Sequence, residues 1–547
     1  MRRFAVLAVA AIALVAMLPA RARTLPAPPS GGVPAVRGVV HVHTNRSDGT
    51  GSIDDVIRAA ATAGLKFVIV TDHGDATRAP DLPDYRDGVL YIDAVEISTR
   101  DGHLVALGLP RAPYPLGGEG RDVVDDIHRM GGLAIAAHPG SSKPELQWTD
   151  WSASLDGLEW LNADSEWRDE RPWTLARALL TYPFRPPQAL ALLLDRPEGV
   201  IRRWDDLAQH RRVAGLAAVD AHARVGVRSL GEPYDTAGSL HFPSYVNSFR
   251  EFSVELSNAR LNGNAEADAR TVIDAIREGA FYSTVDALAG PAALSVAAGG
   301  EERAHLHVEA QAPGAATITL FRDGAPVATA QGGQLDHDAS TAPGVYRVEV
   351  ALPGSPGTPP VPWLMSNPIY VKRAPDGSPP QPQSPPRTSA TLYNGGPARG
   401  WTIEKSASSD AAMDVIGALP GSQLRLRFAI SGTAADSPYV AFVASAGPAI
   451  AMYDRIGFTA RADRPMRLSI QLRASAGEGE RWHRSVYLDQ TPRTIDLPFA
   501  DFRPRGTTTS AQPVLSKVDA ILFVVDTVNA KIGSNGQVQI DDVRLAR

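Results

Sequence analysis

Between residues 37 and 288, short apolar runs alternate with amphipathic segments of helical period, and most of the runs end at a histidine or an acidic residue. This alternation predicts a β/α fold with a parallel sheet. The predicted strands span residues 38–43, 66–71, 89–96, 103–109, 133–137, 157–161 and 213–219. In a β/α barrel the carboxyl ends of the strands share one face. We therefore expect the polar residues at these ends to converge on a single site.

Nine side chains at or near these strand ends have the chemistry of metal ligands. They are His41, His43, Asp48, His73, Glu96, His103, His138, Asp220 and His222. Because side chains of a strand alternate between its two faces, His41 and His43 are expected to project side by side and to bind a cation together. Any one of the histidines alone could be structural, but the repeated His-x-His and Asp-x-His pairs predict a metal centre.

The size of this set indicates more than one cation. A carboxylate such as Glu96 can bridge two cations that would otherwise repel each other. Nine ligands suffice for two or three divalent ions and still leave positions open for water and substrate. The chain has no cysteine, so thiolate sites and iron–sulfur clusters are excluded, and imidazole and carboxylate donors suit Zn, Mn or Fe.

Residues 1–22 have the pattern of an export leader. The charged residues Arg2 and Arg3 are followed by apolar residues 4–18 and then by the small residues Ala20 and Ala22. Fifteen apolar residues fall short of the about 20 that span a bilayer, so a cleaved signal is favoured over an N-terminal anchor. We expect a periplasmic or secreted protein, with no membrane span after cleavage. Both the general and the twin-arginine export routes stay open.

The charge argues against a nucleic-acid-binding protein. The formal net charge is −6, and it becomes −9 when the leader, with its three arginines and no acidic residue, is removed. A nucleic-acid-binding domain usually has the opposite sign, so we expect no specific binding of duplex nucleic acid.

With 547 residues the chain is too long for a single core, and its composition changes along its length. The predicted parts are a linker at 23–36, a barrel at 37–290 with a helical insertion at 162–210, an immunoglobulin-like sandwich at 291–373, a proline-rich spacer at 374–390, and a β jelly roll at 391–547. Its terminal strand, Gln539-Ile540-Asp541-Asp542-Val543-Arg544-Leu545, resembles the strands that close jelly-roll carbohydrate-binding modules, which implies a carbohydrate or cell-surface ligand. An insertion after a barrel strand lies over the active face.

For several tryptophans and two further histidines, a structural role competes with a functional one. Trp160, Trp167, Trp173 and Trp204 are expected to form a small core of the insertion rather than to contact substrate. Trp401 and Trp482 are as typical of a core as of a sugar-stacking platform. His305 and His307 repeat the spacing of the first pair, but no ligand cluster accompanies them, so we interpret them as a solvated strand face.

The order of the motifs resembles the PHP (polymerase and histidinol phosphatase) metallohydrolases over residues 37–288. The matching segments are His41-Val42-His43, Ser47-Asp48-Gly49, Thr71-Asp72-His73, Glu96, His103, Ala137-His138-Pro139 and Asp220-Ala221-His222. The resemblance implies a distorted seven-stranded β/α barrel with a di- or trinuclear centre. It assigns one cation to His41, His43, Glu96 and Asp220, a second to Glu96, His103 and His138, and a third to Asp48, His73 and His222.

The resemblance also implies hydrolysis by a water that the cations activate, so that no nucleophilic side chain is required. Glu96 and Asp220 would be the catalytic carboxylates. Asp72, next to a ligand, could orient a metal-bound histidine or transfer a proton.

The substrate is less well defined. Phosphatases of this family usually present an arginine soon after Ala-His-Pro, whereas here Gly140-Ser141-Ser142-Lys143 follows. Lys143 or Arg224 would then contact a phosphoester, with Arg78 and Arg100 as further cations. A small or polymer-linked phosphoester is the preferred substrate. The alternatives are an uncharged carboxylic or carbamate ester, as in a secreted branch that includes carbaryl hydrolase, and a non-catalytic surface-binding protein with a structural metal site.

Overall fold

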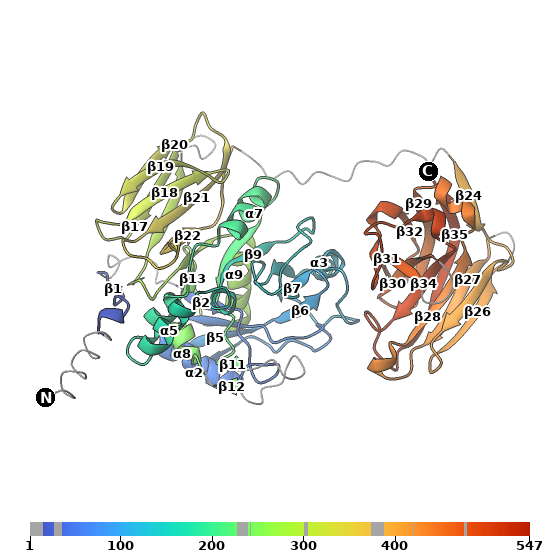
Figure 1. Cartoon of the computed structure of the whole chain (residues 1–547), viewed down its shortest axis with the longest axis horizontal. Coiled ribbons are helices and arrows are strands. Elements are labelled where there is room, and N and C mark those ends of the chain that lie inside the picture. The colour runs from blue at the N-terminus through green and yellow to red at the C-terminus, as the bar shows by residue number, and fades with distance from the viewer. Residues whose placement is uncertain are drawn as a thin grey trace. The chain divides into compact units, whose positions relative to one another are not determined.

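The computed structural model describes residues 15–26, 36–226, 239–240, 242–299, 305–372, 388–418, 421–474 and 479–547. The chain divides into two compact units (Figure 1). The first comprises residues 1–111 and 119–378, and the second comprises residues 112–118 and 379–547. Each unit contains several sheets, so the protein is multidomain and rich in β-structure.

Two sheets occupy the segment predicted to be the barrel. The first has the order β14 (Phe281–Thr284), β13 (Ser253–Leu256), β2 (Val36–Val40), β3 (Phe67–Val70), β5 (Val89–Asp93) and β4 (Asp84–Arg86). The second has the order β10 (Ala214–Ala218), β9 (Gly157–Asn162), β8 (Leu133–Ala136), β7 (Gly102–Leu107) and β6 (Val95–Thr99). Strands β2, β3 and β5 are parallel, and so are β8, β9 and β10.

Short parallel bridges join the two edges of the second sheet, at β6 and beyond β10, to the segments that follow the central strands β2 and β3 of the first sheet. Val42 pairs with Ala221, and His73 pairs with Glu96. Apolar side chains from both sheets form one buried cluster, which includes Val40, Ile69, Val105, Ile135 and Leu216. The bridges and the shared core bring the ends of strands from both sheets to the same place.

The predicted all-parallel order is wrong at β6 and β7. These strands form an antiparallel hairpin, because only Arg100 and Asp101 separate them and a parallel connection needs a dozen or more residues. Gly102, at a φ of 112°, completes the tight turn. Because β7 is antiparallel to its neighbours β6 and β8, its first residues lie beside the carboxyl ends of the parallel strands. His103 is one of these first residues.

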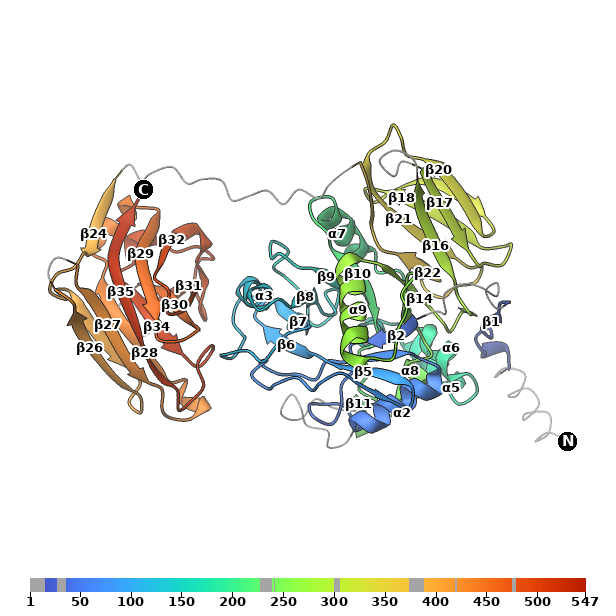
Figure 2. The same ribbon diagram turned by 180° about the vertical axis from the view of Figure 1, so that it is seen from behind.

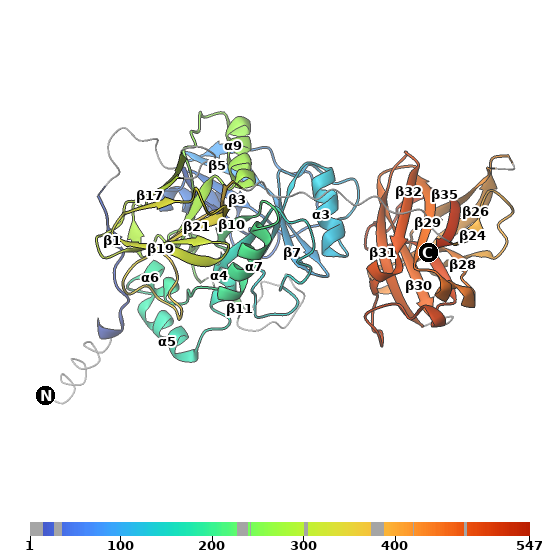
Figure 3. The same cartoon turned by 90° about the horizontal axis from the view of Figure 1, so that it is seen from above.

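Helices cover the two sheets and fill the insertion (Figures 2 and 3). They are α2 (Ile53–Ala63), α3 (Gly120–Arg129), α4 (Ala163–Glu166), α5 (Pro172–Thr181), α6 (Pro186–Ala191), α7 (Glu198–Ala208), α8 (Tyr245–Ser248) and α9 (Ala265–Glu278). Ser52 caps the start of α2 in a capping box with Asp55, and Gly64 ends the helix at a φ of 78°. The insertion is helical, as expected, and contains α4 to α7.

The four tryptophans do not share a core. Trp204 is buried under the sheet, where its Nε1 donates to Val213 O at 2.8 Å. Trp160 belongs to β9, and its Nε1 donates to Ser283 Oγ at 3.1 Å. Trp173 is 67% exposed, whereas Trp167 lines a cavity. The expectation of one tryptophan core in the insertion is therefore wrong, because the helices place these rings against different neighbours.

The predicted sandwich after residue 290 is present but is not separate from the preceding sheets. Its strands are β16 (Leu294–Gly299), β17 (His305–Ala310), β18 (Thr317–Arg322), β19 (Ala325–Gln331), β20 (Gln334–Asp338), β21 (Gly344–Ala351), β22 (Leu364–Ser366) and β23 (Ile369–Val371). Strand β22 pairs with β14, so one sheet runs across the predicted boundary. His305 and His307 are exposed and both face Asp336.

Part of the predicted N-terminal linker is a strand. β1 (Arg23–Thr24) pairs with β15 (Ala289–Gly290), because Arg23 N donates to Leu288 O at 2.9 Å and Leu25 N donates to Gly290 O at 2.8 Å. A further short pair joins β11 (Val225–Gly226) and β12 (Ser239–Leu240). Among the described residues, no helix is both long enough and apolar enough to cross a membrane.

The second unit contains two six-stranded antiparallel sheets. One consists of β24 (Ser389–Tyr393), β26 (Asp410–Ile416), β27 (Gln423–Ala429), β29 (Arg455–Ala462), β32 (Arg493–Pro498) and β35 (Asn535–Ala546). The other consists of β25 (Trp401–Lys405), β28 (Tyr439–Ser445), β30 (Met466–Ala474), β31 (Glu480–Leu488), β33 (Arg503–Pro504) and β34 (Ala520–Asp526). Trp401 and Trp482 belong to their common core. Most of the predicted spacer lies outside the described residues.

A buried ion-pair network joins α7 to the sandwich, and it yields a test of this interface. Arg347, 2% exposed, donates to Asp205 at 2.9 and 3.0 Å and to Glu349 at 2.6 Å. Arg347→Ala would leave two partly buried carboxylates without this cation, so we expect the free energy of unfolding to fall by about 3 kcal/mol in chemical denaturation. Arg270→Ala, in the exposed pair with Glu266, should have little effect. Equal losses in the two variants would contradict a structural role for the network.

Candidate metal centre

The nine side chains singled out in the sequence lie in one cluster. His41 and His43 follow β2, Asp48 lies in the loop after them, His73 follows β3, Glu96 belongs to β6, His103 to β7, His138 follows β8, and Asp220 and His222 follow β10. Each of the six imidazoles has a nitrogen atom within 4 Å of a carboxylate oxygen of Asp48, Glu96 or Asp220. The bridges between the sheets produce this convergence, since residues on either side of them supply most of the ligands.

The backbone turns sharply at three of the ligands. His41, His138 and Asp220 have positive φ values of 68°, 31° and 42°. Such conformations cost on the order of 1–3 kcal/mol for residues other than glycine and are common at functional sites. Strand β2 ends at Val40, so His41 and His43 lie beyond the strand from which they were predicted to project. Their side chains nevertheless lie side by side, with ring centroids 5.1 Å apart.

Glu96 is the centre of the cluster. Its Oε1 accepts from His103 Nδ1 at 2.7 Å and from His138 Nε2 at 2.9 Å. Its Oε2 lies 3.1 Å from His41 Nε2 and 3.2 Å from His43 Nε2. Burial alone would raise the pKa of Glu96, but the surrounding histidines hold it well below its ordinary value. A buried carboxylate that stays charged and offers each oxygen to a different set of imidazoles is suited to bridge two cations.

Asp48 organises the opposite side of the cluster. Its carboxylate lies 3.2 Å from His222 Nε2 and 3.4 Å from His43 Nδ1, and it accepts from Arg224 at 2.8 Å. Burial would raise its pKa, but His222 and the neighbouring histidines lower it overall. Gly49 permits the tight loop, because a Cβ there would lie 2.3 Å from His43 O. This contact explains the glycine of the Ser-Asp-Gly motif.

Two histidines of the cluster have strongly shifted pKa values in opposite directions. Burial would lower the pKa of His43, but the carboxylates of Asp220 and Glu96 raise it to about 10. Burial lowers the pKa of His73 to about 4, although Glu96 opposes this shift. The carboxylates thus favour positive charge at His43, as they would favour a bound cation, whereas burial disfavours the charged form of His73.

The donor set fits divalent cations. His43 Nε2 and Asp220 Oδ1 are buried 3.3 Å apart, and within the described residues neither atom has a hydrogen-bond partner. Facing polar atoms of this kind require a further partner. The described part of the chain contains four groups of possible ligands, and within each group the ligand atoms lie within 4.8 Å of one another. The groups are His43 with Asp48, His73 and His222; His41 with His43 and Glu96; His41 with His138 and Asp220; and His73 with Glu96 and His103.

Sequence reasoning missed the residues that orient the ligands from behind. Glu159 accepts from His41 Nδ1 at 2.5 Å and from the backbone N of His138 at 2.7 Å. Asn162 Nδ2 donates to Glu159 at 2.8 Å and to Asp220 Oδ2 at 3.2 Å. The signal was present in the sequence, because Glu159 is a lone charged residue inside the apolar strand Leu158 to Leu161.

The other residues predicted to act in the site, Asp72, Arg224 and Lys143, differ in how close they lie to the cluster. Asp72 accepts from Thr44 N at 2.7 Å, from Thr44 Oγ1 at 2.6 Å and from Ser47 Oγ at 2.7 Å, so it holds the loop that contains Asp48. Arg224 reaches the cluster through Asp48. Lys143 does not line either of the two cavities beside the cluster. Of the two predicted substrate cations, only Arg224 contacts the site.

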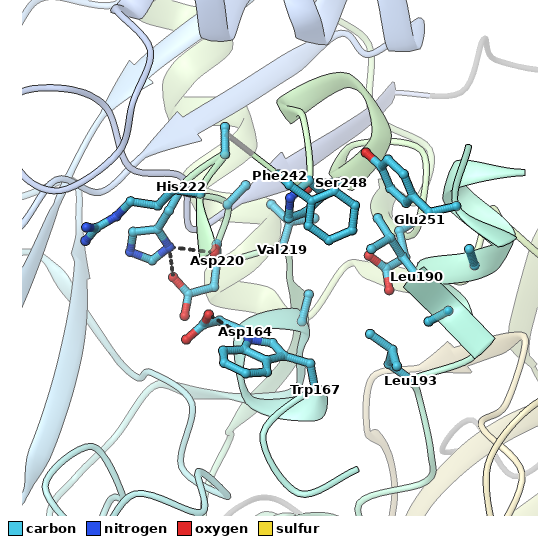
Figure 4. A pocket seen from close by; sticks show the side chains of 18 of the residues that line it. Asp164, Trp167, Leu190, Leu193, Val219, Asp220, His222, Phe242, Ser248 and Glu251 are labelled. Carbon is cyan, nitrogen blue, oxygen red and sulfur yellow. Dashed lines mark hydrogen bonds and ion pairs between the residues drawn. The ribbon is translucent and has the colours of Figure 1, made fainter. Parts of the chain in front are cut away.

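Two cavities border the cluster on different sides. One, of about 350 Å³, is lined by Asp220, His222 and Arg224 together with apolar residues of the insertion (Figure 4). The other, of about 410 Å³, is lined by His73 and Asp72 together with Arg46 and Arg78. Both arginines are already paired, Arg46 with Asp81 at 2.5 Å and Arg78 with Asp93 at 2.8 Å.

Comparisons with known proteins agree with the nature of this site. Residues 40–97 match the family model of the PHP domain, whose superfamily contains metal-dependent hydrolases. The matched segment includes His41, His43, Asp48, His73 and Glu96. An uncharacterized protein of Methanocaldococcus jannaschii is 28% identical over 138 residues, which cover 23% of this chain and 80% of that protein.

Solved structures similar to part of the chain include carbohydrate-binding modules. A family 11 module of a cellulosomal cellulase of Clostridium thermocellum is 19% identical and covers 29% of this chain and 94% of the module, with a TM-score of 0.25. A family 29 module is 11% identical and covers 29% of this chain and 91% of its own, with a TM-score of 0.20. An exo-β-agarase is 10% identical over 29% of this chain and 25% of its own, with a TM-score of 0.22.

Removal of the charge on Glu159 should weaken metal binding. Glu159→Gln keeps the size of the side chain but loses the carboxylate that fixes His41 and the backbone at His138. We expect the affinity for Zn²⁺, measured by competition with a chelator, to fall about 10- to 100-fold. Glu145→Gln, the same substitution at an exposed position, is the matched control. An unchanged affinity in Glu159→Gln would show that Glu159 does not support the ligands.

Glu251, on the wall of the first cavity, gives a prediction about pH. Burial raises its pKa from 4.5 to about 8, so the folded state binds this proton more tightly than the unfolded state does. Between pH 4.5 and about 8 the unfolded state binds fewer protons than the folded state. The free energy of unfolding therefore falls as pH rises through this range. Glu251→Gln should remove this loss. We expect the variant to gain on the order of 3 kcal/mol over wild type between pH 5 and pH 8.5, measured by denaturant unfolding. A pH-independent difference would contradict the shift.

Proposed function

We propose that the protein is an exported metal-dependent hydrolase of esters, in which the two bridged sheets form a distorted β/α barrel of the PHP type. The single observation that supports this most strongly is the convergence of nine imidazole and carboxylate groups around Glu96. A site that only stabilises the fold needs one closed coordination sphere. This cluster has far more ligands than one cation can use, and it borders two cavities.

The ligand sets expected from the sequence are the proposed sites for two or three Zn, Mn or Fe ions. Divalent cations in such a site activate water for hydrolysis and neutralise the charge that develops on the substrate. Glu96 would help to hold the cations together with His103 and His138, and Asp220 would complete a set with His41 and His43. Glu159 and Asn162 keep His41 and Asp220 in their orientations. The protein thus supplies a rigid, charged frame, and no nucleophilic side chain is needed.

A phosphoester is the first candidate substrate. Arg224 lies at the cluster, where its guanidinium contacts Asp48, and Arg46 and Arg78 line the cavity beside His73. These cations would complement a phosphoryl group on the side of the cluster that faces the polar cavity. Lys143, which sequence reasoning proposed for this role, is replaced in the proposal by the arginines that line this cavity.

An uncharged carboxylic or carbamate ester is the second candidate, and one observation favours it. Arg46, Arg78 and Arg224 all have carboxylate partners, so little of their charge is available for a dianion. The larger part of the other cavity wall is apolar. A neutral ester would meet no penalty from the carboxylates that surround the centre.

The remaining parts of the proposal rest on the sequence. Residues 1–22 would direct export to the periplasm or the medium. The C-terminal sandwich would attach the enzyme to a carbohydrate or to a cell surface, through side chains other than Trp401 and Trp482, because both are buried in its core.

The proposal is tested with the full mature chain loaded with Mn²⁺ or Zn²⁺. Hydrolysis is measured on aryl phosphate mono- and diesters and on naphthyl carboxylic and carbamate esters. Glu96→Gln should lower kcat/KM by more than about 100-fold and should reduce the bound metal per chain, because the bridging charge is lost. The matched control is Glu145→Gln, which keeps the ligand set intact.

Each outcome selects one interpretation. Turnover of phosphoesters that depends on Glu96 supports the first candidate, and turnover of the neutral esters alone supports the second. If wild type and Glu96→Gln are equally inactive on every substrate while wild type binds metal, the protein is a non-catalytic binding protein with a structural metal site.

A further inference from the structure

The cavity on the His222 side is built mainly by the helical insertion. Its apolar wall comes from α4 to α6 and from the residues around them: Trp167, Leu175, Ala178, Leu179, Leu190 and Leu193. Figure 4 shows Asp220 and His222 on one side of the cavity and Leu190, Leu193 and Glu251 on the opposite side. The cavity therefore extends from the proposed cation site to an apolar wall that contains none of the nine candidate ligands.

Several contacts hold this wall in place. Trp167 Nε1 donates to Asp164 at 3.1 Å, and the guanidinium of Arg168 lies 4.6 Å from the centre of the Trp167 ring. The rings of Tyr182 and Phe242 meet edge to face with centroids 4.3 Å apart. A cavity whose aromatic lining is braced in this way is largely formed before a ligand enters, which is typical of small-molecule sites.

The chemistry of the cavity differs from that of the reaction centre. Hydrolysis of an ester at the cations requires only polar groups, yet an apolar space of about 350 Å³ opens beside two of the ligands. Water in such a space gains few hydrogen bonds, so its displacement by an apolar group is favourable. The position next to Asp220 and His222 identifies the group that would fill it, since a substrate bound at the cations would extend into this space.

We propose that this cavity binds an apolar group of the substrate, one or two aromatic rings in size, while the ester bond lies at the cations. The inference rests on the proposed hydrolase function and adds the substrate class to it, and it applies equally to an aryl phosphoester and to a neutral aryl ester. The residues of the insertion are thus specificity determinants, and they contact neither the cations nor the reacting atoms.

Glu251 adds a polar feature to this wall. It is 4% exposed and lines the cavity, and its burial raises the pKa of the carboxyl group to about 8. At pH 7 the group is mainly protonated and can donate a hydrogen bond. A ring that has a hydrogen-bond acceptor on its far side would therefore fit better than an unsubstituted ring.

The test compares two substitutions of leucine by tryptophan on the same helix. Leu175 lines the cavity, whereas Leu180 is 53% exposed and is not among its lining residues. Leu175→Trp should fill the cavity, and Leu180→Trp is the matched control. Binding of 2-naphthol to the Zn²⁺-loaded protein is measured by titration calorimetry, and kcat/KM is measured for benzyl and methyl esters of the same acid, whose leaving alcohols are similarly reactive. Burial of a ring predicts that wild type prefers the benzyl ester about 10- to 100-fold.

We expect Leu175→Trp to weaken 2-naphthol binding at least about tenfold and to abolish the preference for benzyl over methyl esters, with Leu180→Trp unchanged. Leu193→Ala, which enlarges the cavity, should shift the preference from benzyl toward naphthylmethyl esters, and it serves if Leu175→Trp does not fold. The cavity proposal is overturned if wild type hydrolyses benzyl and methyl esters equally well and Leu175→Trp binds 2-naphthol as wild type does. If wild type hydrolyses no ester but the binding pattern holds, the hydrolase proposal fails and the cavity remains a site for apolar ligands.

Discussion

The burial of three mutually close carboxylates, Asp48, Glu96 and Asp220, is the constraint on which the first unit depends. None of these charges could remain in the interior alone, because the desolvation of an unpaired carboxylate costs several kcal/mol. Six imidazoles surround them, and the raised pKa values of His41, His43 and His138 show that the carboxylates attract positive charge strongly. Protons or divalent cations can supply that charge. Cations do so without requiring the imidazoles to be protonated.

The fold concentrates these groups by placing the ends of strands from two sheets against each other. The bridges Val42–Ala221 and His73–Glu96 lie between the ligands, so the contacts that join the sheets and the contacts that form the site involve the same short segments. The positive φ values at His41, His138 and Asp220 turn side chains inward at the points where regular strand geometry would alternate them. Stability of the sheet junction and geometry of the site are therefore coupled.

The sequence was sufficient to predict the nine-residue cluster, because a strand end is a position that apolar periodicity locates to within a few residues. The sequence did not predict the role of Glu159 behind His41 and His138. A single acidic residue in an apolar strand is visible in the sequence, but its spacing does not identify its partners. The antiparallel hairpin of β6 and β7 was not predicted, because residues 89–96 have the pattern of one strand, whereas in the structure β5 ends at Asp93 and β6 begins at Val95. The pairing of β22 with β14 joins distant segments, and no local pattern predicts such a pairing.

Under the proposed function, the position of the insertion would allow chemistry and specificity to vary separately in this unit. Asp220 and His222 are shared by the cluster and the apolar cavity, but the remaining apolar wall comes largely from α4 to α6, which contribute no ligand. Helices α5 and α6 both begin at prolines, Pro172 and Pro186, so their boundaries are set locally. Substitutions in these helices can reshape the cavity while the bridged sheets keep the ligand geometry. The cations and their frame would thus define the reaction, and the insertion would define which ester reaches them.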